Sequence, residues 1–112
     1  MSDPRIRTLK IKTGVVKRLT KEKLIYEKEA EQQRDRVKKY KDEGRDEADI
    51  RKQEEVLAEA FSMIPDCQRR LSTAYQELNG ILASEEDLKE TEEYILASQI
   101  LEEAKPELPS YT

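Results

Sequence analysis

The sequence predicts an all-α fold, an elongated antiparallel three-helix bundle that runs up, down and up with coiled-coil-like packing. The first observation is the composition: 41% of the 112 residues are charged and 36% apolar, with 3 Gly and 4 Pro, which is typical of long helices around a narrow core. The second is a seven-residue spacing of apolar residues over two long stretches. The third is a set of turn and capping signals that separates these stretches from a shorter third one. We therefore expect a single domain over residues 1–105.

The first predicted helix spans residues 4–43. Asp3 is suited to accept hydrogen bonds from the free amides of the first turn, and Pro4 fits the first helical position. Gly44 is the first strong helix breaker after a long run of helix formers. Counted with Leu9 at position a, most inward heptad positions are apolar. The a and d residues are Leu9, Lys12, Val16, Leu19, Lys23, Tyr26, Ala30, Gln33, Val37 and Tyr40.

The second predicted helix spans residues 47–82 and has the strongest heptad pattern in the chain. Asp46, followed by Asp49, resembles a capping box at its start. The a positions are Ile50, Leu57, Ile64, Leu71 and Leu78, and the d positions are Gln53, Ala60, Cys67, Ala74 and Ile81. Pro65 lies inside this pattern and removes one backbone donor, so we expect a kink there. Because the heptad phase continues across Pro65, the pattern predicts one bent helix.

The third predicted helix spans residues 85–104, with Ser84 as its N-cap and acidic residues in its first turn. Its apolar face is expected to contain Leu88, Ile95, Leu101 and Ala104. Residues 106–112 contain two prolines and are expected to form a flexible tail without fixed structure. Because the third helix is much shorter than the other two, part of the seam between them should stay uncovered. That gap is a natural place for a partner.

Several classes of chemistry are excluded by residues that the sequence lacks. It contains no His and one Cys, Cys67, so it offers no imidazole base, no Cys-His nucleophile pair and no thiolate cluster for zinc. Cys67 occupies a d position, which favours a core residue over a reactive thiol. Gly occurs at 14, 44 and 80, too sparsely for a phosphate-binding loop. We expect no enzyme activity, no cofactor, no metal site and no small-molecule substrate.

The sequence also predicts a soluble protein of a reducing compartment. The longest unbroken apolar run, residues 94–97, is far too short to cross a bilayer. The first ten residues lack the apolar segment of a signal peptide. No membrane partner is expected.

Charge is distributed unevenly along the chain. Residues 1–45 have a net charge of +7 and residues 46–112 a net charge of −11. Within the first helix, the positive charge is concentrated in a basic set formed by Lys10, Lys12, Lys17, Arg18, Lys21 and Lys23. Two interpretations stay open: complementary charge aligns this helix with its acidic neighbours, or the outward part of the set attracts an acidic partner protein. Nucleic acid is not expected, because the acidic remainder would repel phosphates and no aromatic residue is interleaved with the basic ones.

A second unusual stretch surrounds Pro65. Phe61 and Met63 occupy positions e and g, beside the predicted seam, and Asp66 follows the proline. Core packing explains Ile64 in this stretch, at position a. The two flanking apolar side chains are either peripheral core or a partner-facing patch next to the kink.

Two blocks of sequence are more specific than a generic heptad pattern: DPRIRTLKIKTGVVKRLTKEKLIYEKEA, residues 3–30, and MIPDCQRRLSTAY, residues 63–75. They closely resemble the tubulin-specific chaperone A family, also called tubulin-folding cofactor A, and the resemblance extends over most of residues 3–105. It implies a cytoplasmic, cytoskeleton-associated three-helix bundle that binds β-tubulin after release from the chaperonin and holds it for heterodimer assembly. It implies no ATPase or GTPase activity.

The competing hypothesis is a structural coiled-coil protein whose exposed seam pairs with itself. For the family function we expect a monomer in the free state, since this leaves the surface available to a different partner. The candidate partner-binding residues are Lys10, Lys12, Lys17, Arg18, Lys21, Lys23, Phe61, Met63, Pro65, Asp66 and Arg69.

Overall fold

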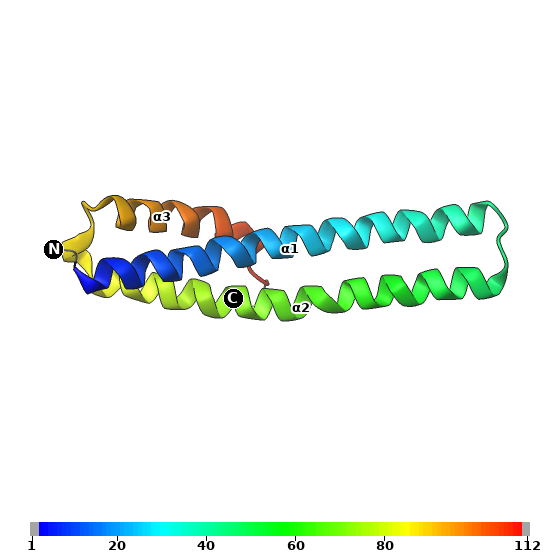
Figure 1. Cartoon of the computed structure of the whole chain (residues 1–112), viewed down its shortest axis with the longest axis horizontal. Coiled ribbons are helices and arrows are strands. Elements are labelled where there is room, and N and C mark those ends of the chain that lie inside the picture. Colours follow the sequence, from blue (N-terminus) through cyan, green and yellow to red (C-terminus); the bar gives the residue numbers. More distant parts are fainter. Residues whose placement is uncertain (1–2, 111–112) are drawn as a thin grey trace. The chain divides into compact units, whose positions relative to one another are not determined.

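The structure, a computed structural model, describes residues 3–110 and contains helices but no strand over that range (Figure 1). The helices are α1 (Pro4–Asp42), α2 (Glu47–Ser84) and α3 (Glu92–Ala104), with the 3-10 turns η1 (Glu86–Leu88) and η2 (Lys105–Glu107) on either side of α3. The predicted all-α class with three helices is confirmed.

The chain divides into two compact units. Unit 1 contains the described residues 3–21 and 68–110, and unit 2 contains Glu22–Cys67. Both long helices contribute to both units. The heptad pattern of the sequence continues across the two boundaries and did not predict this division.

The start of α1 is the one that the sequence predicts. Pro4 is its first residue, and Asp3 caps it: the amide of Arg5 donates to Asp3 Oδ1 at 2.9 Å and the amide of Ile6 to the Asp3 carbonyl at 3.0 Å. The cap satisfies amides that have no partner inside the helix. Asp42, one residue before the predicted end, is the last helical residue.

Gly44 ends α1 through a Schellman motif. Its φ is +66°, a left-handed conformation that no other described residue adopts. The amide of Gly44 donates to the Lys41 carbonyl and that of Arg45 to the Tyr40 carbonyl, each at 3.1 Å. These bonds satisfy two of the last carbonyls of the helix. The guanidinium of Arg45 lies 4.3 Å from the centre of the Tyr40 ring and packs the turn against α1.

Helix α2 starts at Glu47 as predicted and extends two residues beyond the predicted end, to Ser84. The turn signal at Asn79 and Gly80 lies inside the helix, because tertiary packing overrides a local preference of this size. Pro65 lies inside α2 as well, and the helix continues through it without a break. The kink at Pro65 stays a prediction.

The predicted start of the third helix is wrong by seven residues. Helix α3 begins at Glu92, and its N-cap is Thr91, whose Oγ1 accepts from the amide of Tyr94 at 3.2 Å. Ser84, the predicted cap, is still part of α2 and donates from Oγ to the Ile81 carbonyl at 3.2 Å. The sequence contains two candidate caps, Ser84 and Thr91, each followed by acidic residues. The turn η1 lies between them, with Leu88 buried.

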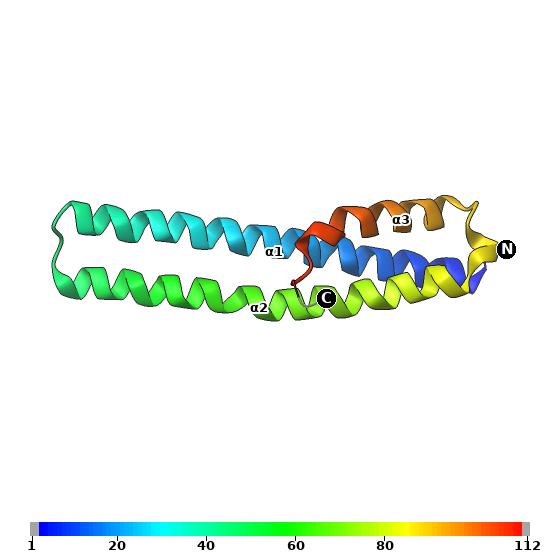
Figure 2. The ribbon, with the colours of Figure 1, turned by 180° about the vertical axis from the view of Figure 1, so that it is seen from behind.

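The segment after α3 is also more ordered than expected. Lys105–Glu107 form the turn η2, which follows α3 at the red end of the ribbon (Figure 2). Pro109 is buried. The expectation of a tail without fixed structure is therefore wrong for residues 106–109. Burial of the apolar proline ring stabilises this arrangement in proportion to the apolar surface that it removes from water. Residues 111 and 112 of the predicted tail lie outside the described residues.

Unit 1 is an antiparallel three-helix bundle. Its helices are the N-terminal part of α1, the C-terminal part of α2, and α3, which lies beside α1 (Figure 1). The largest fully buried side chains of the described residues all belong to this unit: Leu9, Val16, Leu71 and Leu78. Of the residues expected on the apolar face of the predicted third helix, Leu88, Leu101 and Ala104 are buried, but Ile95 is 48% exposed. Ile95 lies on the opposite face because nine residues separate it from Ala104 in α3, which is two and a half turns at 3.6 residues per turn.

Unit 2 is an antiparallel helical hairpin, closed by the turn at Gly44. Its inward positions follow the predicted heptads, but their burial is less complete. Ala30 and Val37 of α1 are buried, whereas Ile50, Leu57 and Ile64 of α2 are only partly covered. Gln33 and Gln53 face each other across the hairpin, since Gln33 Nε2 donates to the Gln53 carbonyl at 2.9 Å and to Gln53 Oε1 at 3.0 Å.

Candidate partner-binding surfaces

The basic set of α1 does not form one surface. By heptad position Lys10, Lys17, Arg18 and Lys21 point outward, and all four are exposed. Lys12 and Lys23 occupy the inward positions d and a. The six residues are close together in the chain, but a helix distributes neighbouring residues over different faces.

The two inward lysines are engaged within the chain. Lys12 Nζ lies 3.0 Å from Glu77 Oε2 on α2, within unit 1. Lys23 is 5% exposed, and its Nζ lies 3.3 Å from Glu27 Oε1 one turn further along α1. Of the two interpretations of the basic set, pairing with an acidic neighbour within the chain therefore applies to Lys12. This ion pair is exposed to solvent, so it adds little stability. Neither residue belongs to the outward part of the basic set.

Two of the outward lysines lie close to α3. Lys10 and Lys17, with Gly14 between them, line a shallow groove in unit 1 together with Glu92, Glu93, Leu96 and Ile100. Carboxylates of α3 therefore lie on the same groove as ammonium groups of α1. Lys21 continues this row of α1 side chains by helical spacing. Among residues 3–110, Lys10, Lys17 and Lys21 form no ion pair within 4 Å.

The stretch around Pro65 is largely exposed. Phe61 is 38% and Met63 48% exposed, and Pro65 is exposed as well. Phe61 and Met63 lie on opposite sides of the seam, as positions e and g require. Asp66, in unit 2, and Arg69, in unit 1, both already have an interaction within the chain.

A groove in unit 2 was not predicted from the sequence. Its floor is apolar, and its α1 side is basic. It is lined by Arg34, Val37, Lys38 and Lys41 of α1 and by Glu54, Leu57, Ala58 and Phe61 of α2. The guanidinium of Arg34 lies 5.3 Å from the centre of the Phe61 ring, a cation–π contact that holds the ring at the groove. The heptad register contained the signal, because every lining residue occupies position a, b or e.

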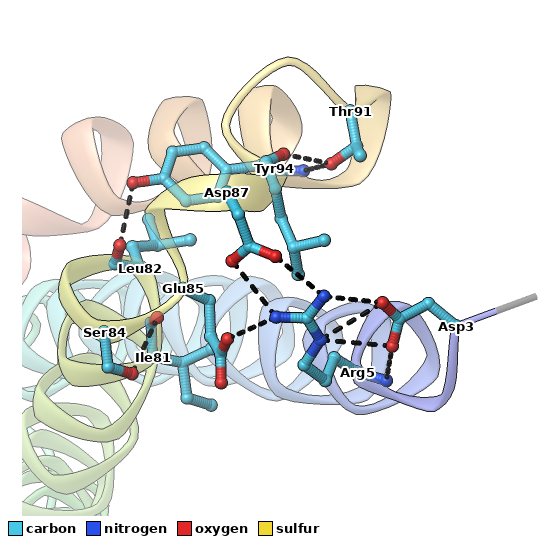
Figure 3. Close-up of polar contacts among 10 residues, drawn as sticks. Asp3, Arg5, Ile81, Leu82, Ser84, Glu85, Asp87, Thr91 and Tyr94 are labelled. Carbon is cyan, nitrogen blue, oxygen red and sulfur yellow. Dashed lines mark hydrogen bonds and ion pairs between the residues drawn. The ribbon is translucent and has the colours of Figure 1, made fainter.

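Arg5 binds three carboxylates in unit 1 (Figure 3). Its guanidinium binds the cap residue Asp3 at 2.7 Å, Glu85 at 2.7 Å and Asp87 at 2.9 Å. The hydrogen bonds from Arg5 hold the pKa of Asp3 and that of Asp87 below the ordinary value of 3.8. The same bonds raise the pKa of Arg5. This cluster attaches the start of α1 to η1.

The described residues contain one cysteine and no cluster of potential metal ligands. Cys67 is buried. Residues 3–110 contain no group of three or more acidic or sulfur side chains placed to hold a metal ion. Over the same range, no helix combines the length and the apolarity that crossing a membrane requires.

The comparison with known proteins agrees with the resemblance of the two sequence blocks. The sequence model of one family, "Tubulin binding cofactor A", matches residues 4–101. Human "Tubulin-specific chaperone A" is 55% identical over 107 residues, which cover 96% of this chain and 99% of the human protein.

Solved structures of the family have the same fold. The structure titled "human tubulin chaperone cofactor a" superimposes with a TM-score of 0.82 at 53% identity, covering 91% of this chain and 99% of that one. The structure of tubulin folding cofactor A from Arabidopsis thaliana gives a TM-score of 0.86 at 40% identity, covering 92% and 97% of the two chains. With its fold, its sequence and nearly its whole length in agreement with these proteins, this chain belongs to the tubulin binding cofactor A family.

Proposed function

We propose that the chain is a tubulin-folding cofactor, which captures β-tubulin after its release from the chaperonin and holds it until it assembles with α-tubulin. The observation that carries this proposal is the nearly full-length match to relatives named tubulin-specific chaperone A. In this function the chain works in the cytoplasm, in association with the cytoskeleton, and is a monomer when free.

The proposed function requires binding alone. A stiff helical surface that covers part of an unassembled subunit prevents it from aggregating before it finds its partner. The exposed apolar residues of unit 2 and the outward lysines of α1 support such a role, because they combine hydrophobic contact with long-range attraction. Nothing in this mechanism needs a nucleotide, a metal or a covalent step.

The direct test is capture of purified β-tubulin in solution. Sedimentation velocity should show a 1:1 complex and a monomeric free chain at micromolar concentration. The competing hypothesis, a self-associating structural coiled coil, predicts a dimer or larger species without tubulin. A monomer that leaves β-tubulin unbound would refute the proposed function.

The outward part of the basic set should control the rate of association. We expect Lys17→Glu, Arg18→Glu and Lys21→Glu, combined in one variant, to slow capture, and capture by the parent to weaken as salt rises. Screening limits the reach of such charges to about 8 Å at physiological ionic strength. Lys52→Glu, Lys89→Glu and Lys105→Glu form the control, since they reverse three exposed charges outside α1. Equal rates for both folded variants would leave the basic set without a role in capture.

The proposal includes a role for Pro65, since a bend there would shape the surface around Phe61. Pro65→Ala restores a backbone donor to α2, so its melting temperature should stay the same or rise. Binding of β-tubulin should fall. A stable variant that captures β-tubulin as well as the parent would assign Pro65 to the architecture of the helix alone.

A further inference from the structure

In unit 1, helix α3 covers one particular side of the α1–α2 pair. Thr13 and Leu82, at position e, and Ser72, at position b, are buried there. The Tyr94 hydroxyl of α3 donates to the Leu82 carbonyl at 2.8 Å. On the opposite side, Ile11 at position c is 56% exposed. The b and e positions of the heptads therefore mark the side on which a third helix packs.

In unit 2 the same heptad positions are open and form the groove described above. Phe61 and Arg34 occupy position e, and Ala58 and Lys38 occupy position b; all are exposed. Beneath them Leu57, a core residue at position a, is only partly covered. This side of the hairpin has the apolar floor of a helix-packing surface but no helix of the described chain within unit 2 to cover it.

The charge of the groove restricts what binds in it. Arg34, Lys38 and Lys41 line its α1 side, and Glu54 is its one carboxylate. Lys38 and Lys41 form no ion pair within 4 Å among the described residues. An occupant that places carboxylates along this side would meet unpaired cations, whereas a basic one would be repelled.

Helix α3 is an example of a helix that packs on the b and e positions, and it is acidic and amphipathic. It contains four glutamates and neither Lys nor Arg, and its buried face consists of Ala97, Ile100, Leu101 and Ala104. Two of its glutamates, Glu92 and Glu93, share a groove with Lys10 and Lys17. The chain thus already places an acidic amphipathic helix on the b and e side of its own bundle in unit 1.

We infer that the groove of unit 2 binds an acidic amphipathic helix of the captured tubulin chain. The apolar face of that helix packs on Val37, Leu57 and Phe61, and its carboxylates lie along Lys38 and Lys41. This inference rests on the proposed function and adds to it the location of the contact and the chemistry of the bound segment. The mode is that of a helix bound in a groove, read by apolar anchors with flanking charge.

Matched substitutions inside and outside the groove test the location. Phe61→Ser in the groove should weaken β-tubulin binding about tenfold or more, since it removes a large apolar anchor. Ile95→Ser is the control, because Ile95 is 48% exposed but belongs to unit 1 and to neither proposed binding surface. Lys38→Glu with Lys41→Glu should slow association at low salt, whereas Lys39→Glu with Lys52→Glu, both at position c, should leave it unchanged. All these side chains are exposed, so circular dichroism should report intact folds.

The outcomes separate this inference from the proposed function. Failure of the parent chain to bind β-tubulin refutes both. A parent that binds, with groove variants that bind equally well, overturns the groove and leaves the function standing. Equal losses from groove and control variants also overturn it. If the groove variants change the self-association of the chain instead, the occupant is a second copy and the inference is wrong.

Photocrosslinking tests the chemistry of the occupant. Ala58→p-benzoylphenylalanine places a crosslinker inside the groove, and Glu59→p-benzoylphenylalanine places the same group outside it, one residue along α2. We expect the first variant alone to label one segment of β-tubulin, which mass spectrometry should identify as helical, amphipathic and rich in Asp and Glu. Labelling of a basic or extended segment at position 58 would overturn the assignment.

Discussion

Units 1 and 2 are built from one heptad pattern but bury it to different extents. In unit 1 the a positions Leu9, Val16, Leu71 and Leu78 are fully buried. In unit 2 the a positions Ile50, Leu57 and Ile64 of the same α2 helix are only partly covered. Of the buried apolar residues in the described chain, Ala30, Val37 and Cys67 alone belong to unit 2.

The number of helices explains the difference. Two helices shield only the side chains that point directly at each other, and a third covers the sides of that seam as well. Each additional square ångström of buried apolar surface contributes about 25 cal/mol. Unit 1 therefore contains most of the hydrophobic stabilisation. The heptad pattern specifies which side chains point inward, but the presence of α3 decides how completely they are removed from water.

The largest expected effect comes from truncating the same residue type in each unit. Leu71→Ala in unit 1 should cost about 2–5 kcal/mol, because Leu71 is fully buried and its loss leaves a cavity. Leu57→Ala in unit 2 should cost roughly 1 kcal/mol, because water already reaches part of Leu57. Both residues are inside α2, so their helix propensities cancel. Urea unfolding measures the two losses, and equal values would contradict the comparison.

The glycines should respond with opposite signs. Gly44→Ala in unit 2 should cost about 1 kcal/mol, because alanine is strained at a φ of +66°. Gly80→Ala, inside α2 of unit 1, should gain about 0.5–1 kcal/mol from its better helix propensity. A Cβ meets no atom within 4 Å at either position, so sterics do not confuse the result. Thermal melts of the two variants should shift in opposite directions.

The hydroxyl of Tyr94 tests how α3 is attached in unit 1. Tyr94→Phe removes its 2.8 Å bond to the Leu82 carbonyl and should cost about 1 kcal/mol. Tyr26→Phe in unit 2 is the control, because the Tyr26 hydroxyl has no hydrogen bond with residues 3–110. Hydrogen exchange should speed up in α3 for the first variant and remain unchanged for the second. Protection of α3 that does not change would show that its apolar face alone holds it.

The smallest expected effect is the pH dependence of the Arg5 cluster in unit 1. The pKa values of Asp3 and Asp87 are lowered in the folded chain, so their contribution to stability is fully present above the ordinary value of 3.8 and is lost as the pH falls below it. Arg5→Gln should raise both midpoints in an NMR titration of the carboxyl groups, and that of Asp3 only in part, because the backbone amide of residue 5 still donates to Asp3 Oδ1. Midpoints that do not move would show that Arg5 does not stabilise these charges. The effect is small because the cluster is exposed to solvent.

Features that depend only on neighbouring residues could be predicted from the amino-acid order. The cap formed by Asp3 and Pro4, the stop at Gly44 and the inward a and d positions of α1 and α2 all follow from local backbone chemistry and from the helical period. The family resemblance of residues 3–30 and 63–75 belongs to the same category, since it is a property of the amino-acid order. These features could be predicted because each depends on a few residues that are adjacent in the chain or one turn apart.

Other features depend on how the helices pack and are visible only in the tertiary structure. Ser84 and Thr91 are both followed by acidic residues, but in the structure Ser84 lies inside α2 and Thr91 caps α3. Lys10 and Lys12 differ by two positions, yet one faces the groove with α3 and the other binds Glu77. The groove of unit 2 exists because α3 belongs to unit 1, which leaves the side chains of Arg34, Lys38 and Phe61 open. Burial of a side chain depends on all the elements around it, and contacts between residues far apart in the chain are not encoded in local spacing.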